Sequence, residues 1–124
     1  MMKILITTDW YVPVINGVVT SVINLKNELT KMGHDVRVLT LQQENHVIVD
    51  KTYYVKSISA ETIYPNARIV SSTAKKEINE IIKWKPDIIH SQCEFSTYFL
   101  AKKISKKLGI PIVHTYHTVY EDYV

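Results

Sequence analysis

Short apolar runs alternate with amphipathic stretches along the chain. Residues 3–8 are almost continuously apolar, which is typical of a parallel strand buried on both faces. Gly33 then predicts the left-handed cap of a helix, and residues 36–41 predict a second strand. Between the two strands, apolar residues recur at helical spacing, namely Val18, Val22, Leu25, Leu29 and Met32. The N-terminal third therefore predicts a strand–helix–strand unit.

The pattern is less regular between residues 42 and 72. Residues 47–49 and 52–58 have strand-like composition, and Asp50-Lys51 between them is expected to form a hairpin turn. Residues 63–72 are expected to form a loop.

Regular elements return in the C-terminal half. Ser71 or Ser72 is expected to cap a helix that ends at Pro86 and buries Ala74, Ile78, Ile81 and Ile82. Three further elements are expected: a strand at 87–90, a helix at 96–108 capped by Gly109, and a strand at 110–116. Strands that alternate with helices predict an open, mostly parallel α/β sheet.

The composition is that of one globular domain. The chain has 124 residues, of which 46% are hydrophobic and 22% charged, and its apolar runs are too short for a membrane span. Cys93 is the only cysteine, which excludes an internal disulfide and fits a reducing cytoplasm. Because the sequence ends directly after the last predicted strand, we expect it to be part of a longer protein.

The loop after the first strand is the first candidate site. A strand that leads through Gly17 into a helix N-terminus brings free backbone N–H groups and the positive end of the helix dipole together. A glycine also lets an anion such as phosphate approach the backbone closely. A turn glycine without a ligand fits the same pattern, because no Gly-x-Gly-x-x-Gly or Gly-Lys-Ser motif accompanies it.

The second candidate site is His117, just beyond the last predicted strand. Ligands of open α/β sheets bind outside the carboxyl ends of the strands, so this ring could face a ligand. A structural histidine fits equally well. His114 and His117 lack a further ligand cluster, so no metal site is predicted.

Basic residues are concentrated in the C-terminal half. The net charge is only +3, but eight of the 15 Lys and Arg residues fall between positions 75 and 107. With Trp84 at its edge, this basic amphipathic region could rest on an anionic membrane. A solvated outer helix face is the alternative, and nucleic acid is not expected because aromatic residues are not interleaved. The lysines concerned are Lys75, Lys76, Lys83, Lys102, Lys103, Lys106 and Lys107.

Several segments along the chain form a recognisable set, namely residues 2–6, the pattern Tyr11-x-Pro13-x-x-Asn16-Gly17-Val18, and residues 33–36, 86–90 and 109–118. Together they resemble the N-terminal domain of family 4 retaining glycosyltransferases of the GT-B fold. The resemblance covers essentially the whole chain. It implies a Rossmann-like open, mostly parallel sheet with helices on both faces, in which residues 1–124 form the acceptor-side domain. It also implies a missing C-terminal domain that binds the nucleotide sugar.

Residues 94–96, 114–118 and 120–123 look most like the branch of this family that glucosylates 1,2-diacylglycerol in bacterial membranes. The resemblance implies retaining transfer of glucose from UDP-glucose, as a co-substrate, to the lipid hydroxyl, with no cofactor bound by this domain. By resemblance, Gly17 and Asn16 border the donor diphosphate and His117 lies beside the transferred sugar. Tyr11 and Glu94 are placed on the acceptor side. The family often has Gly-Gly where this chain has Asn16-Gly17.

A lipid acceptor favours the membrane interpretation of the lysines. The protein is then expected to be cytoplasmic and peripheral on the inner face of the cell membrane. A lone N-terminal domain cannot close over its substrates, so the isolated chain is expected to be inactive. Two alternatives stay open: a family 4 enzyme with another acceptor, and a non-catalytic α/β binding module whose lysines recruit an acidic partner.

Overall fold

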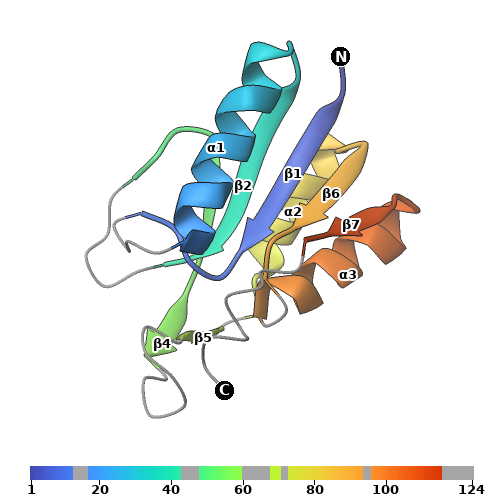
Figure 1. Ribbon diagram of the computed structural model, residues 1–124. Helices are drawn as coiled ribbons and strands as arrows, with labels where there is room; N and C mark the ends of the chain where they lie inside the picture. The colour runs from blue at the N-terminus through green and yellow to red at the C-terminus, as the bar shows by residue number, and fades with distance from the viewer. Residues whose placement is uncertain (13–16, 43–47, 60–67, 71–72, 94–95, 116–124) are drawn as a thin grey trace.

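A computed structural model describes residues 1–12, 17–42, 48–59, 68–70, 73–93 and 96–115. Its centre is a five-stranded sheet in the order β3-β2-β1-β6-β7, in which every pair of neighbours is parallel (Figure 1). The open parallel sheet is therefore confirmed. Its strands are β1 (Lys3–Thr8), β2 (Asp35–Leu41), β3 (Thr52–Val55), β6 (Ile88–Ser91) and β7 (Ile112–His114).

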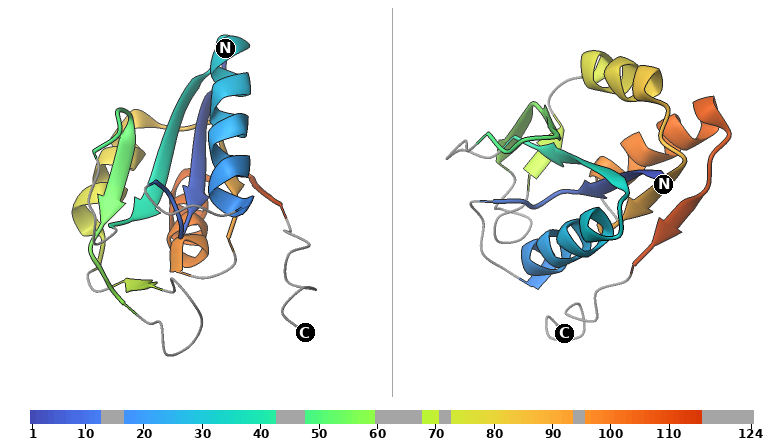
Figure 2. Two further views of the ribbon diagram at one scale, coloured as in Figure 1. Left: turned by 60° about the vertical axis from the view of Figure 1, so that its left-hand side comes forward. Right: turned by 90° about the horizontal axis from the view of Figure 1, so that it is seen from above.

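Three helices cover the two faces of the sheet: α1 (Gly17–Lys31), α2 (Lys75–Trp84) and α3 (Ser96–Leu108). Helix α1 lies on one face, and α2 and α3 lie together on the other (Figure 2). Successive residues of β1 alternate between these layers. Ile4 and Ile6 pack with α1, whereas Leu5 packs with α2 and α3. The helices on both faces confirm the Rossmann-like architecture.

The strand order indicates at which edge of the sheet a ligand is expected to bind. Among the parallel strands taken in chain order, the arrangement is 3-2-1-4-5, so the connections run to one side after β1 and to the other after β3. The point at which the connections change side, the switch point, therefore lies between β1 and β6. In doubly wound sheets, ligands bind in the crevice outside the carboxyl ends of the strands at this switch point.

The middle of the chain departs from the predicted hairpin. A turn does form at Asp50-Lys51, but β3 pairs in parallel with β2, and no strand is present at residues 48–49. The short runs β4 (Ser57–Ser59) and β5 (Arg68–Val70) form a separate antiparallel pair, although residues 63–72 were expected to form a loop. The parallel pairing with β2 places Val55 in the central core, where it is fully buried.

Two helix boundaries also differ from the prediction. Helix α2 is preceded by Ala74 in the left-handed conformation, with no side-chain cap, while Ser71 and Ser72 lie outside the described residues. The helix stops at Trp84 because Lys85 turns left-handed before Pro86. In α1 the predicted buried position Met32 is 69% exposed, since it follows the last helical residue, Lys31.

Gly33 allows a direct stability test because its φ is +90° at the end of α1. An L side chain is strained there, so Gly33→Ala is expected to lower the free energy of unfolding by about 1 kcal/mol. Gly17→Ala is the matched control, since a Cβ at Gly17 meets no atom of the described residues within 4 Å. Urea unfolding followed by circular dichroism measures both. An equal effect of the two substitutions would contradict this account.

Candidate functional site

The carboxyl ends of β1 and β6 converge with the N-termini of α1 and α3. Gly17 is the first residue of α1, and the space where a Cβ would project is open. A helix that begins at a glycine after a strand is the arrangement that the predicted anion-binding loop requires, and the binding role itself stays a prediction. Asn16, the residue predicted beside Gly17, lies outside the described residues.

Asp9 ties the two loops of this edge together. Its Oδ1 accepts hydrogen bonds from the Thr97 backbone N–H at 2.9 Å and from the Thr97 hydroxyl at 2.6 Å. The side chain therefore caps α3 from the end of β1, which is 88 residues away in sequence. Burial raises the pKa of Asp9, and the hydrogen bonds from Thr97 and Ser96 oppose that rise.

Cys93 lies beside Asp9 but is not suited to nucleophilic chemistry. Its thiol is buried, and its Sγ is 3.4 Å from Thr8 Oγ1. Burial and the neighbouring Asp9 charge raise the pKa of the Cys93 thiol to about 11. The residue is therefore a neutral thiol at physiological pH and packs as part of the core on the α1 face.

The end of β7 brings its histidine toward the same edge. His114 Nδ1 lies 3.0 Å from Ser91 Oγ, and its ring meets the Tyr98 ring edge-on at a centroid distance of 5.4 Å. Ser91 also donates to the backbone carbonyl of Cys93 at 2.9 Å. Hydrogen bonds thus join the ends of β6 and β7, and the Tyr98 ring of α3 packs against them.

The predicted site residues are only partly brought together. His117 and Glu94, like Asn16, lie outside the described residues, so their roles stay predictions. Tyr11 is 3% exposed and packs in the core on the α1 face, where burial raises the pKa of its phenol. Its acceptor-side role stays a prediction, and in the structure the ring is part of the core beneath α1.

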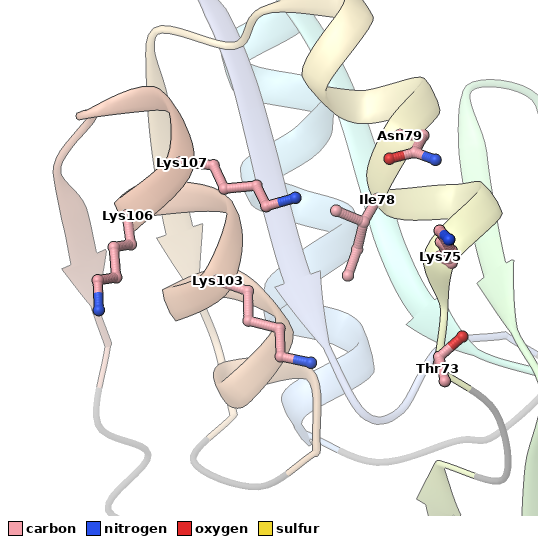
Figure 3. A pocket seen from close by; sticks show the side chains of 7 residues that line it. All are labelled: Thr73, Lys75, Ile78, Asn79, Lys103, Lys106 and Lys107. Atoms are coloured by element: carbon pink, nitrogen blue, oxygen red, sulfur yellow. The ribbon is translucent and has the colours of Figure 1, made fainter.

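The predicted lysines are exposed on α2 and α3, and several of them line a groove between these helices (Figure 3). The groove has a volume of about 600 Å³ and runs along Ile78 and Asn79 of α2. Among the described residues no carboxylate forms an ion pair with its lysines. The lysines that line it are Lys75, Lys103, Lys106 and Lys107.

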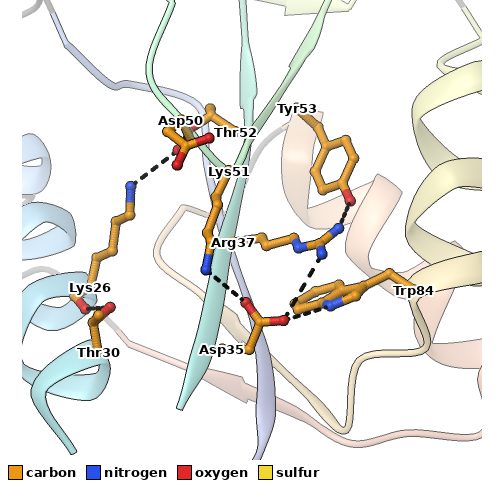
Figure 4. Close-up of polar contacts among 9 residues, drawn as sticks. All are labelled: Lys26, Thr30, Asp35, Arg37, Asp50, Lys51, Thr52, Tyr53 and Trp84. Carbon is orange, nitrogen blue, oxygen red and sulfur yellow. Dashed lines mark hydrogen bonds and ion pairs between the residues drawn. The ribbon is translucent and has the colours of Figure 1, made fainter. Parts of the chain in front are cut away.

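Trp84 does not belong to this exposed surface, which corrects its predicted role at the membrane. It is 8% exposed and its indole Nε1–H donates to Asp35 Oδ2 at 3.0 Å (Figure 4). The Arg37 guanidinium lies 4.3 Å from the centre of the ring. Burial alone would raise the pKa of Asp35, but hydrogen bonds from Trp84 and Lys51 lower it. Trp84 therefore joins α2 to the start of β2.

The described residues contain neither a membrane-spanning helix nor a cluster of metal ligands. No helix in that part of the chain is both long enough and apolar enough to span a bilayer. No cluster of three or more His, Cys, Asp or Glu side chains within it could hold a metal ion.

Sequence reasoning did not single out Asp9, Ser91 or Thr97. Asp9 could have been found, since a carboxylate directly after a buried strand lies where ligands meet a parallel sheet. Its partner Thr97 could not, because the contact joins residues that only the tertiary fold brings together.

An open parallel sheet with helices on both faces and two helix N-termini near its switch point defines a Rossmann-like domain. The model of Glycosyltransferase Family 4 matches residues 15–124. The chain therefore belongs to glycosyltransferase family 4.

Individual relatives support the same assignment. The chain is 36% identical to the alpha-monoglucosyldiacylglycerol synthase of Streptococcus pneumoniae (strain ATCC BAA-255 / R6) over 99% of this chain and 28% of the relative. It is also 36% identical to the enzyme of the same name from Acholeplasma laidlawii, over 98% of this chain and 31% of the relative. The sulfoquinovosyl transferase SQD2 of Arabidopsis thaliana is 30% identical over 82% of this chain and 20% of its own length. The chain thus spans less than a third of each relative.

Asp9 predicts a distinctive pH dependence. Because burial raises the pKa of its carboxyl, the native state binds that proton more tightly than the unfolded state. The contribution of Asp9 to stability therefore falls as pH rises from the unfolded pKa, about 3.9, through the folded one. Asp9→Asn keeps an acceptor for Thr97 and removes the charge, so its stability relative to the parent should be higher at pH 7 than at pH 4.

Asp9→Ala is the contrasting variant. It removes both hydrogen bonds to Thr97 and should lower the free energy of unfolding by about 1–3 kcal/mol. Urea unfolding of both variants at the two pH values measures these differences. If Asp9→Asn were as destabilised as Asp9→Ala, the capping role of the side chain would be refuted. If the stability of Asp9→Asn relative to the parent did not change with pH, the raised pKa of Asp9 would be refuted.

Proposed function

We propose that this chain is the acceptor-side domain of an enzyme that transfers glucose, with retention, from UDP-glucose to the hydroxyl of 1,2-diacylglycerol. The observation that carries the proposal is its 36% identity, over nearly the whole chain, to two alpha-monoglucosyldiacylglycerol synthases. Since the chain spans less than a third of those relatives, a second domain completes the enzyme in this proposal.

Gly17 takes the role of a donor contact. As the diphosphate leaves, negative charge develops on it, and preorganised backbone N–H groups stabilise such charge most effectively. Gly17 begins α1, and no atom of the described residues lies within 4 Å of where its Cβ would stand, so an anion could approach its backbone N–H closely. Asn16 borders the same diphosphate in this proposal, and His117 positions the transferred sugar.

Asp9 supports the acceptor side in the same proposal. It fixes the N-terminus of α3, which directly follows the segment that carries Glu94. Glu94 would then act on the acceptor hydroxyl two residues before a helix N-terminus that Asp9 holds in place. Positioning of this kind lowers the entropy cost of bringing acceptor and donor together.

The lysines of α2 and α3 are the proposed contact with an anionic membrane at the inner face of the cell. They are exposed on the face of the sheet opposite α1. Basic side chains near a surface of anionic lipid each contribute about 1 kcal/mol of attraction. A peripheral anchor would bring the enzyme to a lipid acceptor.

Transfer activity tests the enzyme proposal. In the longer protein, Gly17→Ala should reduce transfer of glucose to diacylglycerol about tenfold or more, because a Cβ would separate the diphosphate from the backbone donors. The measurement is formation of glucosyldiacylglycerol from labelled UDP-glucose. The isolated 124-residue chain should form none, since it cannot enclose the donor.

An unchanged unfolding midpoint of Gly17→Ala is the control for folding. Turnover by the isolated chain would overturn the requirement for a second domain. Transfer by the longer protein to another acceptor, and not to diacylglycerol, would overturn the acceptor assignment while leaving the family intact.

Membrane binding tests the lysine face separately. The chain should co-sediment with vesicles that contain anionic lipid, and binding should fall as the Debye length shrinks from about 10 Å at 0.1 M salt to about 3 Å at 1 M. Equal binding to neutral vesicles would contradict an electrostatic anchor.

A further inference from the structure

Several lysines of α2 and α3 are gathered around one groove and are not spread evenly over the surface. The groove is an open hollow of about 600 Å³ bounded by both helices. Lys103 and Lys107 point from α3 across the groove toward α2, while Lys106 points away from α2 (Figure 3). Ammonium groups from two helices therefore border one volume.

The positive charge of the groove indicates that its ligand is an anion. Four lysines line the groove, and in the described part of the chain none of them forms an ion pair with a carboxylate. Lys75 lies in the first turn of α2, where a positive charge opposes the helix dipole. That position is unfavourable for the helix and favourable for an anion beside it. A compact, multiply charged phosphate suits several lysine donors better than a single carboxylate does.

The remaining lining argues for an apolar attachment on that phosphate. Ile78 lies along the groove and the methylene stems of the lysines line it, so little of its wall is polar apart from the ammonium groups, Asn79 and Thr73. A free inorganic ion would leave this apolar wall exposed to water. An amphiphile places its headgroup against the ammonium groups and its glycerol backbone against the wall.

We propose that the α2–α3 groove binds one phosphomonoester headgroup of a membrane lipid, held between Lys75 of α2 and Lys103 and Lys107 of α3. The proposal rests on the membrane-surface role proposed above and makes it specific. The lysine helices would recognise a particular headgroup chemistry in addition to responding to surface charge.

Vesicle binding of the 124-residue chain tests this site. The probes are phosphatidylcholine vesicles that contain either phosphatidic acid or phosphatidylglycerol, adjusted to equal surface charge. The chain should bind the phosphatidic acid vesicles more tightly, because only the monoester offers a doubly charged terminal phosphate. Equal affinity for the two vesicle types would overturn the headgroup site and leave only surface electrostatics.

Paired substitutions provide the matched control. Lys75→Ala/Lys107→Ala removes two lysines of the groove, whereas Lys83→Ala/Lys102→Ala removes two exposed lysines of the same helices outside it. The groove pair should weaken binding to phosphatidic acid vesicles about tenfold, as expected for lost charge-assisted hydrogen bonds, and the control pair only about twofold. Equal losses would refute the proposal.

A second pair keeps every lysine. Asn79→Asp puts a carboxylate into the groove, and Asn27→Asp makes the same charge change on the exposed side of α1. Only Asn79→Asp should weaken binding to phosphatidic acid vesicles, and similar effects of both would count against the site. Soluble glycerol 3-phosphate should compete poorly, and competition as strong as that of the lipid would overturn the lipid assignment. None of these measurements requires sugar transfer, so the groove can fail while the enzyme proposal stands, and the reverse.

Discussion

The burial of β1 on both faces is the constraint on which the rest of the structure depends. Leu5 and Ile6 are fully buried, yet they face different helical layers. A central strand of this kind has no solvent face, so every neighbouring element must cover it. With β2 on one side and β6 on the other, the switch point falls at the end of β1. The position of the candidate site is therefore a consequence of how the core is built.

The same geometry explains why local sequence patterns predicted most of the sheet. Strand β1 and helices α1 and α3 lie close to the predicted residues because their apolar spacing reports directly on which side is buried. The middle could not be predicted in this way. Strand β3 pairs with β2 in parallel and buries Val55 in the core. The turn at Asp50-Lys51 does not by itself indicate that pairing.

Site residues were predictable to the extent that backbone position alone defines them. The place of Gly17 at the start of α1 was predictable because a glycine between a strand and a helix is itself a recognisable pattern. Trp84 was misplaced because an aromatic at the end of a basic helix has the same pattern whether it faces lipid or, as here, bonds to Asp35. Asp9 was missed because its partner Thr97 is distant in sequence. Side-chain pairs across elements are what a single sequence conceals.

The two helical layers have different proposed roles: α1 contacts the donor, and α2 and α3 contact the membrane. Helix α1 and the exposed lysines of α2 and α3 belong to opposite faces of one sheet. A membrane that contacts the lysine face therefore leaves the α1 face directed away from the lipid. Both layers nevertheless reach the same carboxyl edge, since α1 and α3 begin there and Asp9 joins their loops. An acceptor drawn from the bilayer and a donor held near α1 would thus meet at the end of β1, the most deeply buried strand of the domain.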